Sequence, residues 1–425
     1  MRSADTCTER IKGRLDFQPS TMVTYRDPIH GDIRFSGLLE RIIDTEEFQR
    51  LGEVMQLGMT HKVYTSATHT RLAHSIGVAY LAGEMAKRLR VSDEDVLLIQ
   101  VAALLHDVGH YDFSHALEAI APQHHEENGW GIIRGYVTLP GRESGKIHAL
   151  LREAGIDPER VVGLLAGTSN MPAFYRSIIS SAVIDVDRMD YLARDTYFTG
   201  AVIGTIDTDR LLSVLVVDPR TQQLGIEEKG IASIEQFLAA RRHMYQQVYR
   251  HPSVFSAEVM LRRAVSDGIE VAKPFLYGDD ALIARLATAD ATSTRELVRR
   301  LRRGKHAFHT AAYAVTTSSA PAEREHAQRL CDETTPRTLE RRILEEIGSA
   351  PHEIIVTFGT PTKPKPLPFF PVLRSDGSWE DVYSLSAIAR AIASEEREQP
   401  LLTLHVAPEL DERTRARAID LITSF

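Results

Sequence analysis

Apolar residues recur at helical spacing along most of the first two thirds of the chain. Asp44 can cap one such helix, with Glu47 at its third position. The apolar stripe of this helix is formed by Phe48, Leu51, Val54 and Met55. Because residues three and four apart share one face of a helix, the pattern predicts a helix packed against a core.

Two longer apolar segments follow. Residues 71–90 carry a second stripe, formed by Ile76, Tyr80, Leu81, Met85 and Leu89. Ser92 can cap the next helix, with Asp95 at the third position, and residues 96–105 are apolar nearly all round. Such a segment is typical of a central buried helix, which Gly109 then interrupts.

Residues 178–198 and 231–249 are also predicted to be helical, and residues 212–228 between them to form a β-hairpin. In each helix, residues four apart share one face. They are Asp187, Tyr191 and Asp195 in the first, and Arg241, Tyr245 and Tyr249 in the second.

The pattern changes beyond residue 278. Helical stretches occupy 279–350, and short apolar runs near 353–358, 367–373 and 401–406 predict strands. The expected fold is therefore mainly α, with a helical core, a small β-hairpin and a smaller C-terminal α+β lobe. The expected organisation is a mobile arm over 1–22, a helical domain over 23–278 and the lobe over 279–425.

Composition narrows the class of protein. The chain has 425 residues, of which 43% are hydrophobic, enough for sizeable cores. A net charge of -8 argues against a broad DNA-coating surface. Cys7 and Cys331 form no CxxC pair, which argues against a disulfide framework and a thiolate zinc site. With no apolar signal region or membrane span, we expect a cytoplasmic protein.

The densest chemistry lies at residues 104–115, which hold three imidazoles and two carboxylates directly after the apolar segment. Imidazole nitrogen and carboxylate oxygen are ligands of divalent metal ions. His106 and Asp107 are adjacent, so a helix end or turn must aim both at one ion, and other ligands must come from elsewhere. His74 and one aspartate of 185–190 are the candidates.

Several collinear motifs carry a resemblance to a known family. They lie at 27–31, 42–51, 56–58, 70–77, 106–110, 113–115 and 185–195. In these motifs the chain resembles the HD-domain phosphohydrolases, and within them the deoxynucleoside triphosphate triphosphohydrolases of the SAM-and-HD-domain type. No SAM domain is expected before the motifs. The resemblance implies an oligomerisation or regulatory role for the C-terminal lobe.

By position, the resemblance implies one divalent ion per site, with Mn, Fe, Zn and Mg left open, and allows additional Mg with the nucleotide. The implied metal ligands are His74, His106, Asp107 and Asp187, with Asp185 as a rival for the last. The implied catalytic residues are His110 and His125, with Glu118 orienting an imidazole and His124 as a rival for His125. One of the two histidines is expected to donate a proton to the leaving 5′ oxygen.

The resemblance also implies a substrate-binding set. Phosphate contacts are expected from Arg71, His115, Arg188 and Arg241. The 3′ hydroxyl is expected at Gln56 and Asp195, the sugar near Tyr191, and its crowded 2′ carbon at Leu57 and Tyr249. Tyr245 shares the last helical face, as a site residue or as a core aromatic.

The implied function is hydrolysis of a deoxynucleoside triphosphate (dNTP) at its α-phosphate, giving deoxynucleoside and triphosphate, by a homo-oligomer, a tetramer or a dimer. The family's guanine nucleotide pocket matches at Asp44 and Gln49 but departs at Gly52 and Val23, which leaves another regulatory nucleotide, or none. One alternative is a nucleotidase or phosphodiesterase acting on another nucleotide. The other is a nucleic-acid-binding protein with a vestigial HD site, supported by the basic stretch 299–305 but not favoured; no membrane partner is expected.

Overall fold

The computed structural model describes residues 22–204, 206–270, 275–359, 367–395 and 398–425. The expected N-terminal arm lies outside the described residues, apart from Met22. The described chain is mainly helical and contains three small sheets, which confirms the predicted fold class. In this part of the chain, the helices are all too short or too polar to cross a bilayer.

The chain enters through a hairpin of β1 (Val23–Asp27) and β2 (Gly31–Phe35), which pair antiparallel. Asp27 Oδ1 closes the turn, because it accepts hydrogen bonds from the backbone N–H groups of Ile29 and His30 at 2.9 and 3.0 Å. Asp27-Pro28 and Gly31 are residue types typical of tight turns.

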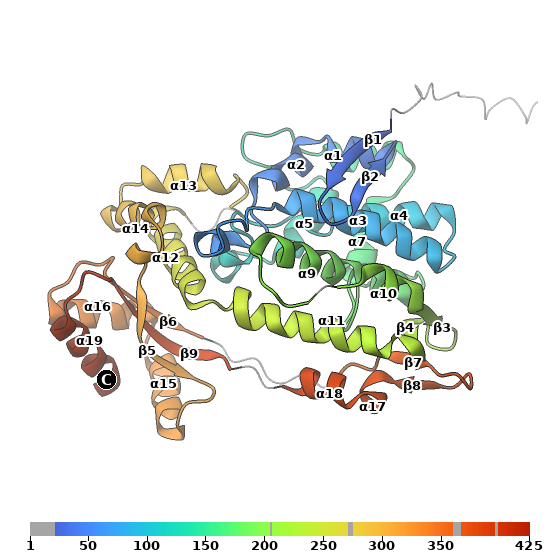
Figure 1. Ribbon diagram of the computed structural model, residues 1–425. Helices are drawn as coiled ribbons and strands as arrows, with labels where there is room; N and C mark the ends of the chain where they lie inside the picture. Colours follow the sequence, from blue (N-terminus) through green and yellow to red (C-terminus); the bar gives the residue numbers. More distant parts are fainter. Residues whose placement is uncertain (1–21, 205, 271–274, 360–366, 396–397) are drawn as a thin grey trace, which may run out of the picture.

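The helices that follow build the main body. They are α1 (Leu38–Ile43), α2 (Glu46–Gln49), α3 (Arg71–Arg88), α4 (Asp93–Leu105), α5 (His125–Ile133), α6 (Lys146–Glu153), α7 (Pro158–Ala166), α8 (Ala173–Ile179) and α9 (Val186–Thr199). Short 3₁₀ turns include η1 (Arg50–Glu53), η2 (Gly58–Lys62), η3 (Ser114–Ala116) and η4 (Glu118–Ile120). In Figure 1, α3 lies beside α4, with α9 below both. The small residues Ala79, Ala82 and Ala86 of α3 are fully buried and permit close helix packing.

Two predicted helices have different boundaries. Thr45, not Asp44, caps α2, since its hydroxyl accepts from Phe48 N at 3.2 Å, and the helix gives way to η1 after Gln49. The predicted helix 178–198 is broken between α8 and α9, because Asp185 accepts hydrogen bonds from Arg188 N and Ser181 N and starts a new helix.

The second half of the main body continues with α10 (Thr208–Val214), β3 (Leu215–Asp218), β4 (Gln223–Glu227), α11 (Ile231–Met244), a π-helical turn η6 (Tyr245–Tyr249) and α12 (Pro252–Gly268). The predicted hairpin is confirmed, although residues 212–214 belong to α10. Strand β4 also pairs in parallel with β7 (Pro371–Leu373), which pairs with β8 (Trp379–Asp381). The C-terminal part of the chain therefore returns to the main body (Figure 1).

The remaining elements lie beyond residue 278. They are α13 (Asp279–Ala287), α14 (Thr292–Arg303), η7 (Lys305–Ala307), β5 (Thr310–Thr316), α15 (Pro321–Glu333), α16 (Pro336–Ile347), β6 (Ile354–Phe358), α17 (Val382–Leu385), α18 (Ala387–Ser394), β9 (Pro400–Val406) and α19 (Glu412–Ser424). Strands β5 and β6 flank β9 in an antiparallel sheet. A separate apolar cluster gathers on this sheet, whereas Leu282, Leu297 and Val372 belong to the main core. The division at residue 278 stays a prediction.

Candidate metal centre and active site

Helix α3 begins next to the site. Thr70 caps it, accepting from Ala73 N, so that Arg71 and His74 stand in its first turn. His74 is fully buried, and its Nδ1 lies 2.8 Å from Asp190 Oδ2. Because a carboxylate accepts only, this bond places the proton of a neutral imidazole on Nδ1 and leaves Nε2 free for an ion.

The C-terminal end of α4 brings the His-Asp pair to the same place. The helix ends at Leu105, His106 is its C-cap, and His106 Nδ1 donates to Ala103 O at 2.8 Å. Asp107 follows outside the helix and forms an ion pair with Arg71. The end of α4 thus directs the side chains of His106 and Asp107 toward the same point. Two adjacent residues need such a helix end to bind one ion.

Helix α9 supplies the last member of the cluster. Asp187 Oδ1 lies 3.1 Å from His74 Nε2 and 3.7 Å from His106 Nε2. Asp185 is fully buried and occupied by capping α9 and pairing with Arg188. Of the two rival aspartates, Asp187 therefore faces the histidines.

This cluster fits a divalent ion. His74, His106 and Asp107 each offer one ligand atom, all within 4.8 Å of one another. His74 Nε2 and His106 Nε2 are buried and have no hydrogen-bond partner in the described part of the chain. Burial opposes the charge on Asp107 and Asp187, but the neighbouring Arg71 and histidines outweigh it and hold both carboxyl pKa values below the ordinary range. Two imidazoles and two carboxylates form a ligand set that such ions accept.

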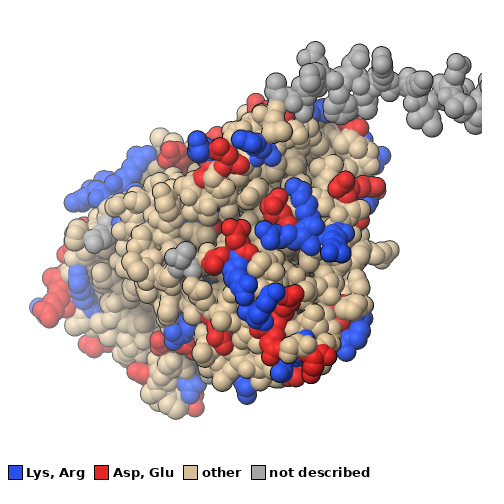
Figure 2. Space-filling view, turned by 45° about the vertical axis from the view of Figure 1, so that its right-hand side comes forward, with Lys and Arg blue, Asp and Glu red and all other residues tan. Residues whose placement is uncertain are grey.

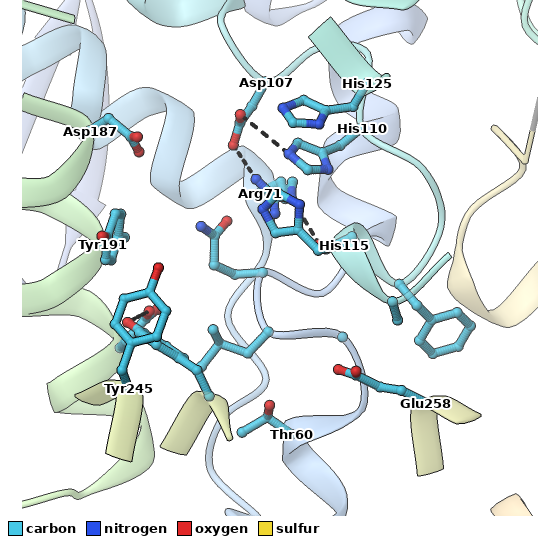
Figure 3. A pocket seen from close by; sticks show the side chains of 18 residues that line it. Thr60, Arg71, Asp107, His110, His115, His125, Asp187, Tyr191, Tyr245 and Glu258 are labelled. Carbon is cyan, nitrogen blue, oxygen red and sulfur yellow. Dashed lines mark hydrogen bonds and ion pairs between the residues drawn. The ribbon is translucent and has the colours of Figure 1, made fainter. Parts of the chain in front are cut away.

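A cavity of about 470 Å³ opens in front of the cluster (Figure 3). Twelve of the candidate site residues line it: Gln56, Leu57, Arg71, Asp107, His110, His115, His125, Asp187, Tyr191, Asp195, Tyr245 and Tyr249. His74 and His106 are outside the lining but lie 3.1 Å from Asp187 and 3.3 Å from Asp107, respectively, and Glu118 contacts the lining histidines. Residues that are dispersed over almost two hundred positions of sequence therefore share one space.

The expected catalytic histidines stack on each other. The rings of His110 and His125 lie 3.8 Å apart between centroids, at an interplanar angle of 17°. Glu118 Oε1 accepts from His125 Nδ1 at 2.6 Å and from the exposed His124 at 3.0 Å. His125, not His124, lines the cavity. Burial, followed by the charge of Arg71, lowers the pKa of His110 well below its ordinary value.

The cavity lining also includes the residues expected to bind the sugar. Asp195 accepts from Tyr249 Oη at 2.6 Å and contacts His69 Nε2 at 2.7 Å. Gln56 Oε1 is buried and has no partner among the described residues. An unmatched acceptor and a fixed carboxylate that line the same cavity are suited to a ligand hydroxyl.

Two expected phosphate contacts lie outside the lining. Arg188 donates to Ser181 O at 2.6 Å and pairs with Asp185. Arg241 lies over the ring of Tyr245, with 5.2 Å between its Cζ atom and the ring centroid, and its buried Nε has no partner in the described chain. Arg241 thus lies next to Tyr245, which lines the cavity.

The site also contains residues that the sequence analysis missed. Asp190 is hydrogen-bonded to His74, and His69 is hydrogen-bonded to Asp195. Thr60 and Glu258 line the end of the cavity remote from Asp187 (Figure 3). Burial raises the pKa of Glu258 to about 7. Asp190 had a signal, since it lies in the same motif as Asp187, whereas Glu258 stands on α12 with no motif around it.

Two family models match the chain. The HD domain model matches residues 71–195, and the HD associated region model matches residues 206–423, about half of the chain. The chain therefore belongs to the HD-domain phosphohydrolase family. Domains of this family bind divalent metals, and membership supports a hydrolase activity.

Relatives agree with the resemblance found in the motifs. An uncharacterised protein of Methanocaldococcus jannaschii is 39% identical over 251 residues, 59% of this chain and 50% of that protein. The human deoxynucleoside triphosphate triphosphohydrolase SAMHD1 is 33% identical over 274 residues, 57% of this chain and 44% of that enzyme. The chain spans about half the length of the curated relatives it matches.

Two crystal structures share the fold over most of the chain. A hypothetical protein from Aquifex aeolicus matches with a TM-score of 0.69 and 26% identity, covering 93% of this chain and 100% of that one. A phosphohydrolase from Bacteroides thetaiotaomicron matches with a TM-score of 0.68 and 25% identity, covering 91% and 100%. The similarity extends beyond the HD domain into the C-terminal part.

Proposed function

We propose that this protein is a metal-dependent dNTP triphosphohydrolase, which hydrolyses a dNTP at the α-phosphate to deoxynucleoside and inorganic triphosphate. The observation that carries the proposal is the shared cavity, which Asp107 and Asp187 of the metal cluster line together with Gln56 and Asp195. Its volume of about 470 Å³ is in the range of cavities that enclose small ligands.

His74, His106, Asp107 and Asp187 would hold the ion. When bound there, a divalent ion supplies Lewis-acid polarisation of a phosphoryl oxygen and lowers the pKa of water. Arg71 lies beside Asp107 and also donates to Ser114 Oγ at 2.8 Å, so its guanidinium is held in one orientation at the cavity. We propose that this guanidinium binds an oxygen of the α-phosphate.

One of His110 and His125 donates a proton to the leaving 5′ oxygen. Without an anion nearby, burial and Arg71 favour neutral His110. A bound triphosphate offsets the positive charge of Arg71 and favours the protonated imidazole, so that protonation follows substrate binding. Glu118 orients His125 through Nδ1, and His115 contributes a phosphate contact at the rim.

Other lining residues select the sugar. Gln56 and Asp195 bind the 3′ hydroxyl, Tyr191 lies near the sugar, and Leu57 and Tyr249 crowd the 2′ carbon. Tyr249 is fixed by its hydrogen bond to Asp195, so a 2′ hydroxyl meets a side chain that cannot easily retreat. We also propose that Arg188 and Arg241 contact phosphate oxygens of the substrate after their guanidinium groups rotate toward the cavity. Assembly into a homo-oligomer remains a prediction.

The test is turnover of each dNTP and rNTP by the purified protein with Mn²⁺, Mg²⁺ or Fe²⁺, with chromatographic separation of nucleoside from nucleotides. We expect deoxynucleoside from dNTPs, little product from rNTPs, and none from Asp107→Ala. Stepwise release of single phosphates would replace the proposal with a nucleotidase. Absence of turnover, even with mixed nucleotides as activators, would replace it with a binding function.

A binding function draws little support from the surface. On the face drawn in Figure 2, basic and acidic side chains are interspersed. Within the basic stretch, Arg300 is 3% exposed and pairs with Glu409 at 2.6 Å, and Arg299 pairs with Glu296 at 2.6 Å. Arginines already paired with carboxylates offer less charge to a nucleic-acid backbone.

A further inference from the structure

Among the described residues that line the cavity, Glu258 is the carboxyl group to which the proposed function gives no role. It stands on α12 and lies with Thr60 at the end of the cavity remote from Asp187 (Figure 3). The phosphates of a dNTP are expected at the metal cluster, and its sugar at Gln56 and Asp195. The base is the remaining part of the nucleotide, so it is left for the end of the cavity that holds Glu258.

The carboxyl group of Glu258 points into the cavity without a protein donor (Figure 3). Its side chain is half-buried, and it forms no hydrogen bond with the described residues. Arg262 lies one turn further along α12, but its guanidinium is occupied elsewhere. Its Cζ atom lies 5.6 Å from the ring centroid of Phe255, and its Nη1 donates to Ala116 O at 3.4 Å. The oxygens of Glu258 are therefore available to a ligand.

The surroundings of Glu258 favour a ligand that brings hydrogen-bond donors. Burial raises the pKa of this carboxyl group to about 7, and the charge of Arg262 offsets the shift only in part. Donors from a ligand stabilise the ionised form, which burial alone disfavours. Because an ionised carboxylate only accepts hydrogen bonds, the complementary part of a base is one that carries N–H groups.

The four bases differ in the donors of their Watson–Crick edges. Guanine presents two neighbouring donors, the ring N1–H and the 2-amino group. Adenine and cytosine present an amino group beside a ring nitrogen that only accepts, and thymine presents a single N–H between two carbonyl groups. The two oxygens of a carboxylate can accept both guanine donors in parallel, whereas each of the other bases sets an acceptor against one of them.

The same end of the cavity offers further contacts for a base. Phe113 and Ala116 are buried and line the cavity, which provides apolar surface for the faces of the ring. The hydroxyl of Thr60 can donate to the O6 carbonyl of guanine. Apolar walls with a few placed polar groups are the usual construction of a pocket that selects its ligand.

We propose that Glu258 recognises the base of the substrate and makes the enzyme prefer dGTP, by accepting hydrogen bonds from guanine N1–H and from the 2-amino group. The proposal rests on the proposed function, since it takes a dNTP to bind with its phosphates at the metal cluster. Glu258 has no part in the proton transfer. Its loss should therefore change the preference among bases and leave hydrolysis of the other dNTPs intact.

The test compares kcat/KM for dGTP, dATP and deoxyinosine triphosphate (dITP), which is dGTP without the 2-amino group. The full-length protein is assayed with Mn²⁺ above the pKa of about 7, so that Glu258 is mainly ionised. Wild type should favour dGTP over both other substrates by about 10–100-fold, the effect of losing a hydrogen bond to a charged group. Glu258→Gln keeps the size of the side chain but turns an NH₂ group toward a guanine donor, so dGTP should lose its advantage over both.

Glu325→Gln is the matched control, because Glu325 is exposed on α15 and outside the cavity lining. It should keep the wild-type ratios. Equal kcat/KM for dGTP, dATP and dITP in wild type would overturn the proposal. So would a Glu258→Gln variant that loses activity toward all substrates in the same proportion, because a structural role of Glu258 would then suffice. In both cases the dNTPs are still hydrolysed by wild type, and the proposed function stands.

If no condition gives dNTP turnover, the proposed function fails, and binding still decides the role of Glu258. Calorimetric titration of the Mn²⁺-loaded protein with dGTP and with dATP then replaces the kinetic assay. Wild type should bind dGTP more tightly than dATP, and Glu258→Gln should remove this difference. Equal affinities of wild type for the two nucleotides would overturn the recognition of guanine.

Discussion

Asp190 connects the metal cluster to the interior of the protein. Both of its oxygens are buried, contacting His74 Nδ1 at 2.8 Å, His30 Nε2 at 2.7 Å and the guanidinium of Arg194 at 2.8 and 2.9 Å. Arg194 in turn donates to Asp27 Oδ2 at 2.7 Å. The network fixes the ring of His74 before any ion binds, which is the role of outer residues around metal sites.

Replacement of Asp190 by Asn should weaken Mn²⁺ binding by about 10–100-fold. An amide has one accepting oxygen, and its NH₂ group would face a donor of Arg194 or His74. Calorimetric titration with Mn²⁺ measures the affinity, after circular dichroism has established that the variant is folded. Asp93→Asn, an exposed change at the start of α4, should bind as wild type does. Equal affinities for both variants would contradict the role of Asp190.

At the residue scale, sequence motifs located the members of the metal cluster because each stands at a helix end or on a helix face that its neighbours dictate. Site residues that lie outside these motifs were harder to predict. His69 reaches Asp195 across 126 positions of sequence, and Glu258 enters the cavity from α12. Such contacts depend on how helices pack, which no local pattern encodes.

At the scale of elements, the turn before η3 shapes the cavity. Phe113 and Ser114 both have left-handed backbones, with φ of 55° and 57°, which costs about 1–3 kcal/mol each for residues other than glycine. Asp279, at the start of α13, holds this turn by accepting from Phe113 N at 2.6 Å and from Met55 N at 2.9 Å. Helix α13 thereby positions His115, although it contributes no residue to the lining.

The buried position of Asp279 should make stability depend on pH. Burial raises its pKa to about 8, although the two backbone hydrogen bonds oppose the shift. Between the ordinary value of 3.8 and about 8, the folded state binds a proton that the unfolded state releases. The free energy of unfolding should therefore fall as pH rises through this range, by less than about 1.4 kcal/mol per pH unit for this group.

Urea unfolding of wild type and Asp279→Asn at about pH 5 and about pH 8 measures this effect. The variant cannot titrate at this position, so its free energy of unfolding should change less between the two pH values. A residual slope is expected from Asp112 and Glu258, whose pKa values are also raised by burial. Equal slopes for both proteins would contradict the assignment to Asp279.

Long periodic elements were predicted well, and short or interrupted ones were not. Helix α4 begins at the expected cap, Ser92, and α3 covers Arg71–Arg88 of the expected segment 71–90. The break before α9 was missed because the helical periodicity of residues 178–198 concealed the N-cap at Asp185, a local signal that divides the segment. Strand β5 was missed because alanine, frequent in its sequence, favours helices.

At the scale of the whole molecule, a buried ion pair connects the two apolar cores. Arg263 of α12 pairs with Glu340 of α16, and the two residues are 8% and 2% exposed. Glu340 Oε1 also accepts from Val356 N of β6 at 2.9 Å. The sequence predicted a separate C-terminal lobe from its change in pattern but gave no sign of this connection, since the pair spans 77 positions.

Replacement of Glu340 by Ala should lower the free energy of unfolding by about 3 kcal/mol, because buried Arg263 keeps only Asp267 as a carboxylate partner and Val356 N loses its acceptor. Denaturant unfolding followed by circular dichroism measures the change. Glu345→Ala, on an exposed position of the same helix, should change the value by no more than about 0.5 kcal/mol. A small effect of Glu340→Ala would show that the ion pair is replaceable.

The central claim is that hydrolysis occurs at the α-phosphate, and it is tested most directly by hydrolysing a dNTP in ¹⁸O-labelled water. Attack at the α-phosphorus predicts one ¹⁸O atom in inorganic triphosphate and none in the deoxynucleoside, as measured by mass spectrometry. Asp187→Ala should form neither product. Label in orthophosphate or in pyrophosphate released beside a nucleotide would contradict the account, because the attacked phosphorus would not be the one that bears the sugar.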